Sequence, residues 1–219
     1  MVYDTATKCL YFVPGTNTRQ FWKFDTETGS WETLPPVPLG GGKNLKGGTG
    51  MAYLNGIVYL LKGSKTKEFY GYNTATGEWL QTLQLPPEGA YTGKGYGDGS
   101  CLIAYDDSTL YLLRGRYNEF YKYDILANSW SAESIMPFSH PMWGKKKKVG
   151  EGGSMTLKGG KIYAFKGSNT KEFWMFDPGT GKWTAKDTIP RGPEKKYVKG
   201  GGGLATFDGT IYALKGNNT

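Results

Sequence analysis

Short stretches in which apolar and polar residues alternate recur along the chain, and most end at glycine, asparagine or aspartate. In the segment 152–189, residues 154–157 alternate and end at a Lys-Gly-Gly-Lys turn, and an apolar stretch over 162–166 follows. Residues 172–177 form a third stretch, and a fourth begins at Trp183 after an Asp-Pro-Gly-Thr-Gly turn. This pattern predicts antiparallel strands joined by tight turns. No segment keeps a helical period, so we expect an all-β chain.

The four-strand pattern repeats about every fifty residues. In each complete unit a Phe is followed ten residues later by a Trp, as in Phe21 and Trp31. A glycine ends the second apolar stretch of every unit at Gly15, Gly63, Gly115, Gly167 and Gly216. Repeated four-stranded antiparallel sheets predict a β-propeller, here a single domain, or a fragment of one, with four complete blades and a half-blade. We expect the repeats at about 1–46, 47–96, 97–149, 150–199 and 200–219.

Several repeated positions resemble kelch repeats over nearly the whole chain: the glycines, the Tyr of the second strand, an aromatic residue followed by Asp or Asn, and the Trp of the fourth strand. One departure is that the double glycine of kelch blades is here a basic residue and a glycine, as in Lys62-Gly63. This variant is similar to secreted or surface kelch-like proteins of prokaryotes. The resemblance implies an extracellular or cell-surface location.

Two recurring sets of residues are interpreted as structural. The Trp residues are expected to fill the space between blades, because aromatic side chains bury large areas; they are Trp31, Trp79, Trp130 and Trp183. A basic residue that ends the second strand and a Glu that opens the third recur as Lys62 with Glu68, Arg114 with Glu119 and Lys166 with Glu172. The first unit has Pro14 and Gln20 instead, so both charges are absent together and an ion pair is predicted. Such a pair contributes about 0–1 kcal/mol if it is exposed.

The connections between strands carry most of the positive charge. In a four-stranded meander, the connections from the second to the third strand and the segments between blades emerge on one face. They hold 20 basic and 7 acidic residues in a chain whose formal net charge is +8. We therefore expect one strongly basic face, which attracts anionic ligands.

Lysines in this loop face are the binding candidates. One lies close to each glycine-rich run that precedes a first strand, and if those strands begin near the axis, these lysines ring the mouth of the central channel. The alternative is that they are solvated loop charges that keep the inner edges soluble. The candidates are Lys46, Lys94, Lys145, Lys146, Lys147, Lys148, Lys196 and Lys199.

Composition excludes several classes of chemistry. One histidine and two cysteines cannot build a multi-His metal site or a disulfide framework, so we expect no metal and no cofactor. Kelch enzymes of the galactose oxidase type need copper-binding histidines, whereas His140 stands alone and is expected at the surface. No run approaches the ~18 apolar residues of a membrane span. No nucleic-acid-binding module is recognisable, so sequence-specific nucleic-acid binding is not expected.

The sequence thus predicts a non-enzymatic binding or scaffold propeller whose basic face recognises a protein or an acidic polysaccharide. Two alternatives stay open. The incomplete fifth unit leaves unpaired strand edges, which favours a self-assembling subunit of a ring or an extracellular filament. The weaker alternative is a sialate-type kelch epimerase. Residues 25–31 superficially resemble a sialidase turn motif, but the chain lacks the arginine cluster expected to bind a carboxylate.

Overall fold

The computed structural model describes residues 1–142 and 145–218, and no helix occurs among them. The first sheet contains β1 (Val2–Asp4), β2 (Cys9–Phe12), β3 (Phe21–Asp25) and β4 (Ser30–Leu34). The second contains β5 (Gly50–Leu54), β6 (Ile57–Leu61), β7 (Phe69–Asn73) and β8 (Glu78–Leu80). The third contains β9 (Cys101–Ala104), β10 (Thr109–Leu113), β11 (Phe120–Asp124) and β12 (Ser129–Glu133). The fourth contains β13 (Ser154–Lys158), β14 (Lys161–Phe165), β15 (Phe173–Asp177) and β16 (Lys182–Ala185), and a last sheet pairs β17 (Gly203–Phe207) with β18 (Thr210–Leu214).

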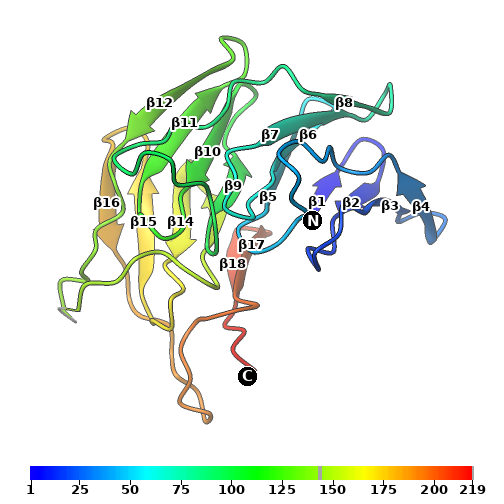
Figure 1. Ribbon diagram of the computed structural model, residues 1–219. Coiled ribbons are helices and arrows are strands. Elements are labelled where there is room, and N and C mark those ends of the chain that lie inside the picture. The colour runs from blue at the N-terminus through cyan, green and yellow to red at the C-terminus, as the bar shows by residue number, and fades with distance from the viewer. Residues whose placement is uncertain (143–144, 219) are drawn as a thin grey trace.

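The sheets are arranged as blades around a common centre (Figure 1). Consecutive strands of each sheet are hydrogen-bonded neighbours, so every blade is a simple antiparallel meander. The first strands of neighbouring blades lie side by side: β1 beside β5, β5 beside β9, β9 beside β13, and β13 beside β17. This arrangement confirms the predicted all-β propeller of four blades and a partial blade.

Each contact between complete blades centres on a tryptophan. The Trp79 ring lies 5.1 Å from the ring of Phe21 in the preceding blade, and its indole N–H donates to the Pro35 carbonyl at 3.0 Å. The indole ring is thus held by apolar packing, and its N–H group is held by a hydrogen bond. Equivalent ring contacts join Trp130 to Phe69 at 5.3 Å and Trp183 to Phe120 at 5.0 Å.

The tryptophan of the first blade, Trp31, does not take part in this series of contacts. Trp31 is 61% exposed, and its ring contacts among the described residues lie within its own blade, such as that to the Phe24 ring at 4.8 Å. With Phe12, Trp22 and Thr33 it lines an apolar hollow of about 450 Å³. The first blade therefore presents an uncovered apolar face.

Glycines allow the backbones of neighbouring blades to meet near the axis. Gly48 has a φ of 85°, and a Cβ at this position would overlap the carbonyl group of Gly97 in the next blade. Gly99 repeats this geometry, with a φ of 86°, against Gly150. The glycine-rich runs are thus required by close packing as well as by positive φ.

We expect Gly48→Ala to destabilise the protein more than Gly29→Ala. Both residues have positive φ, but no atom lies within 4 Å of a Cβ built at Gly29. Gly29→Ala should therefore cost only the left-handed strain of about 1–2 kcal/mol, and Gly48→Ala that strain plus displacement of the next blade. Denaturant unfolding measures both losses. Equal losses would contradict a packing role for Gly48.

A second comparison tests the contacts between blades. Trp130→Ala should lower the free energy of unfolding by about 3–5 kcal/mol, because it removes a packed indole and its hydrogen bond from the blade interface. Trp31→Ala should cost much less, since this ring is mostly exposed. Thermal and denaturant unfolding of the two variants provide the measurement, and a loss for Trp31→Ala as large as that for Trp130→Ala would overturn this account.

Candidate functional site

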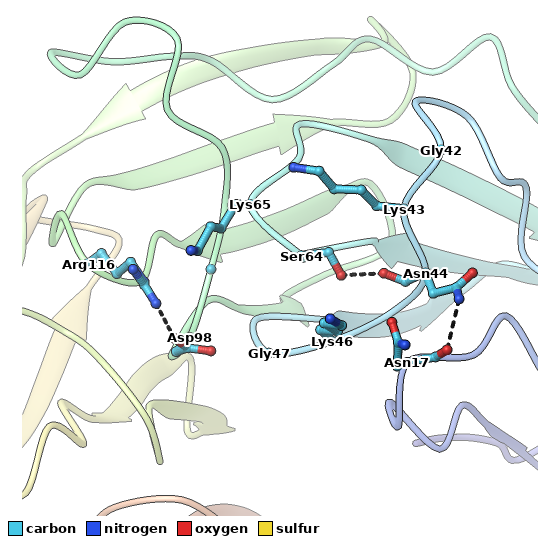
Figure 2. Close-up of a pocket in the computed structure, with 11 residues that line it drawn as sticks. Asn17, Gly42, Lys43, Asn44, Lys46, Gly47, Ser64, Lys65, Asp98 and Arg116 are labelled. Atoms are coloured by element: carbon cyan, nitrogen blue, oxygen red, sulfur yellow. Dashed lines mark hydrogen bonds and ion pairs between the residues drawn. The ribbon is translucent and has the colours of Figure 1, made fainter.

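Two adjoining cavities lie where the loops between second and third strands meet the segments that lead into the next blades. Their volumes are about 580 and 550 Å³, and both are lined by Asp98 and Arg116. Figure 2 shows the first cavity, with basic side chains from several blades around it. The basic residues that line one cavity or both are Lys43, Lys46, Lys65, Arg116, Lys148 and Lys199.

Buried apolar neighbours position two of these lysines. Lys46 follows Leu45, and Lys199 follows Val198, and both apolar side chains are fully buried. Leu45 and Val198 lie in segments between blades, and each amide donates at 2.9 Å to a threonine carbonyl in the loop between the second and third strands of the blade before that segment. These anchors fix the backbone beside each lysine and so help to position the two basic side chains that line the cavities.

Left-handed backbone conformations position two more basic residues. Lys65 and Arg116 have φ values of 60° and 72°. Their amides donate at 2.7 Å to the carbonyls of Tyr96 and Val149, respectively, in the segments that lead into the next blades. Each loop is therefore attached to its neighbour directly beside the side chain that lines the cavity.

The first cavity combines positive charge with neutral hydrogen-bonding groups. Four basic residues and a single acidic residue, Asp98, line it. Asn44 and Ser64 belong to a local network, in which the Ser64 hydroxyl donates to the Asn44 carbonyl at 2.5 Å and the Asn44 amide to the Asn17 carbonyl at 2.9 Å (Figure 2). Such a lining suits an anion that also carries hydroxyl groups.

Asp98 forms an ion pair with Arg116 at the boundary between the two cavities (Figure 2). The Arg116 and Asp98 side chains are 45% and 34% exposed, respectively, so solvent screens the pair and its contribution to stability is small. The pair instead lowers the local positive charge and orients the Arg116 guanidinium.

The structure separates the predicted binding lysines into two groups. Lys46, Lys148 and Lys199 line the two cavities. The remaining candidates are absent from the lining of either cavity: Lys94, Lys145, Lys146, Lys147 and Lys196. Of these, Lys146 and Lys147 line a separate hollow beside Phe138, and Lys196 donates to the Asn218 carbonyl at 3.0 Å.

Sequence reasoning missed Lys43, Lys65 and Arg116. Lys65 and Arg116 lie in the loop between the second and third strands, shortly after the basic residue assigned to an ion pair. The repeat itself carries a signal for them, because this loop position varies from blade to blade, whereas a glycine precedes it in every unit and a threonine follows it in every unit except the third. Lys43 lies in a segment between blades and carries no comparable signal.

The three predicted ion pairs are buried rather than exposed. Lys62 Nζ lies 2.7 Å from the Glu68 carboxylate, and the side chains are 0% and 17% exposed. Arg114 lies 2.5 Å from Glu119, and Lys166 is paired with Glu172. The small energy of exposed pairs therefore does not apply here, since removing one partner of a buried pair costs roughly 3–5 kcal/mol.

Each basic partner of these pairs also holds the segment that leads into its own blade. Lys62 Nζ donates to the Leu39 carbonyl at 2.5 Å, and the Glu68 carboxylate accepts the Gly41 amide at 2.5 Å. Lys166 Nζ likewise donates to the Pro137 carbonyl at 2.8 Å. The pairs therefore fix the loops that surround the cavities without lining them.

These surroundings shift two pKa values. Burial alone would raise the pKa of Glu68, but Lys62 and the Gly41 amide outweigh it and hold that pKa below its ordinary value. Burial lowers the pKa of Lys166, and Glu172 opposes this shift. The Glu68 carboxylate is thus stabilised in its charged form.

His140 is buried, which corrects the expectation of a surface histidine. It is 3% exposed, its ring lies 5.6 Å from that of Trp174, and its Nδ1 accepts the Met142 amide at 3.2 Å. The segment between the third and fourth blades thus folds over β15 and packs His140 against it.

Within residues 1–142 and 145–218, no three His, Cys, Asp or Glu side chains are grouped as metal ligands. Over the same residues, no helix is long and apolar enough to cross a membrane.

Comparison with solved structures finds YjhT, described as "Structure of YjhT". The two chains superpose with a TM-score of 0.69 at 15% sequence identity, covering 97% of this chain and 70% of YjhT. At this identity the likeness shows a shared fold alone. Comparisons with protein-family models and with curated proteins find no match.

The lowered pKa of Glu68 predicts an acid-dependent loss of stability. The unfolded chain takes up a proton near the ordinary pKa of 4.5, whereas folded Glu68 resists protonation to lower pH. Its contribution is therefore complete above about pH 4.5 and is lost as the pH falls through the lower folded value. Denaturant unfolding between about pH 6 and pH 3 measures this loss, and Glu68→Gln should show a weaker dependence on pH. An unchanged dependence in this variant would remove Glu68 from the explanation.

Proposed function

We propose that the chain is a kelch-type propeller that binds an acidic polysaccharide at the mouth of its central channel. The observation that carries this proposal is the gathering of Lys43, Lys46, Lys65 and Arg116 around one cavity that holds a single acidic residue. Several cations in a partly enclosed space concentrate an anionic ligand more strongly than dispersed surface charges. The kelch resemblance favours an extracellular or cell-surface location, where such polymers occur.

A polysaccharide suits the cavities better than a small inorganic anion. Volumes of about 580 and 550 Å³ fall within the usual range for small-molecule sites. The amide and hydroxyl groups of Asn17, Asn44 and Ser64 can pair with sugar hydroxyls, while the lysines contact carboxylates. Because the two cavities adjoin at Arg116, successive acidic units of one chain can occupy both.

Two other functions would use different features. Self-assembly is favoured by the exposed Trp31 face of the first blade, and the solution mass measured by light scattering decides it. A sialate-type epimerase would use the same channel mouth, and turnover of a sialic acid followed by NMR decides that function. We favour binding because Asp98 is held in an ion pair with Arg116, which suits a fixed charge better than proton transfer.

Charge reversal within the cavities provides the test. We expect the triple variant Lys46→Glu/Lys148→Glu/Lys199→Glu to bind oligogalacturonate at least about tenfold more weakly than the unchanged chain, because three cations of the lining become repulsive. Isothermal titration calorimetry at low and moderate salt measures the affinity. Neutral dextran of similar length controls for binding that does not depend on charge.

The lysine run outside the cavities offers a matched control. Lys145→Glu/Lys146→Glu/Lys147→Glu changes the net charge by the same amount, and these three residues are exposed. This variant should retain most of the affinity for oligogalacturonate. Equal losses in the two triple variants would show diffuse attraction to polyanions and would overturn the proposed site.

A further inference from the structure

A column of planar side chains runs from the protein core to the surface beside the second cavity. The Arg114 guanidinium carbon lies 5.0 Å from the ring centroid of Tyr96 and 4.4 Å from that of Tyr117. The Tyr117 ring in turn lies 4.3 Å from that of Tyr91, measured between centroids. Tyr96 and Arg114 are fully buried, whereas Tyr91 is 36% exposed, so the column ends in an aromatic ring at the surface.

Three members of this column, Tyr96, Arg114 and Tyr117, differ from the residues at the equivalent positions of the second and fourth blades. A lysine ammonium is not planar, so only the guanidinium can stack on the neighbouring rings. The ion pair with Glu119 does not require these tyrosines, because the lysines of the other two blades form the same pair where no aromatic residue stands at the equivalent positions. The equivalents are Leu45 and Val149 for Tyr96, Lys62 and Lys166 for Arg114, and Lys65 and Asn169 for Tyr117.

Buried groups fix the segment that carries Tyr91. The Ala90 amide donates to the Glu119 carboxylate at 2.7 Å, and the Arg114 guanidinium donates to the Lys94 carbonyl. Arg114 and Glu119 form one of the buried ion pairs described above. The surface ring is therefore anchored on both sides along the chain, so little conformational freedom would be lost when a ligand packs against it.

A cation adjoins the surface ring. Lys148 Nζ lies 5.5 Å from the ring centroids of both Tyr91 and Tyr117, and Lys148 and Tyr117 line the second cavity. The electron-rich face of a tyrosine ring attracts C–H groups, and an ammonium group attracts a carboxylate. A sugar acid in its pyranose form offers both, because one face of its ring carries C–H groups and its carboxylate projects from the edge.

We propose that Tyr91 and Tyr117 form a stacking subsite for one pyranose ring of an acidic polysaccharide, with the carboxylate of that sugar unit bound by Lys148. This inference rests on the proposed polysaccharide binding and adds a means of selection to it. Cations alone attract any polyanion, whereas a stacking subsite selects a polymer built of rings. The protein is therefore expected to distinguish acidic sugars from a polymer that offers the same carboxylates without rings.

Removal of the surface ring tests this selection. We expect Tyr91→Ala to bind oligogalacturonate about three- to tenfold more weakly, because one aromatic contact is lost, whereas its affinity for polyglutamate of equal charge should be unchanged. Tyr91→Phe keeps the ring and should keep the affinity. Tyr3→Ala is the matched control, because Tyr3 is also an exposed tyrosine and lines neither cavity. Isothermal titration calorimetry measures the affinities, and circular dichroism checks that each variant is folded.

Saturation-transfer NMR reads out the contact itself. On saturation of the aromatic protons of the protein, we expect transfer to the C–H protons on one face of the galacturonate ring, and loss of this transfer in Tyr91→Ala. Equal losses of affinity for the two polymers, no loss for either, or transfer spread evenly over the sugar would overturn the stacking subsite and leave the cationic cavities in place. If the charge-reversed triple variant keeps its affinity while Tyr91→Ala loses it, the cationic site is wrong and the ring contact stands. Absence of oligogalacturonate binding by the unchanged chain would overturn both proposals.

Discussion

The structure depends on one repeated contact, the packing of a tryptophan from each blade against a phenylalanine of the blade before it. A four-stranded sheet cannot bury both of its faces alone, so each blade relies on its two neighbours. Trp79, Trp130 and Trp183 supply the contact at three interfaces, and their indole N–H groups fix the spacing by donating to carbonyls of the preceding blade. The stability of the domain is therefore largely a sum over neighbouring pairs of blades.

Rigidity near the axis has a different origin. There the backbones of neighbouring blades approach too closely for side chains, and glycines such as Gly48 meet the next blade directly. Buried cations then attach the longer segments between blades to the same scaffold, as Lys62 does through the Leu39 carbonyl. Loops without regular secondary structure thus hold lysines beside the two cavities in defined positions.

The architecture could be predicted from the sequence because the same spacing of glycines and aromatic residues occurs in four complete units. Strand order, blade number and the half-blade all follow from the spacing of glycines and aromatic residues. Burial was harder to predict: the ion pairs and His140 are polar, and whether they are covered depends on segments that fold over them from other parts of the chain. The contributions of Lys65 and Arg116 to the cavities depend on left-handed backbone conformations, which residue type alone does not indicate.

The buried cations bind the interblade segments through main-chain carbonyls: those of Leu39, Glu88, Lys94, Pro137 and Phe138. A main-chain carbonyl is present whatever side chain its residue carries. The segments can therefore exchange most of their side chains while they remain attached at the same points. In this respect the propeller resembles an antibody framework, in which a constant scaffold supports variable loops, and its loop face is a natural starting point for diversification by directed evolution.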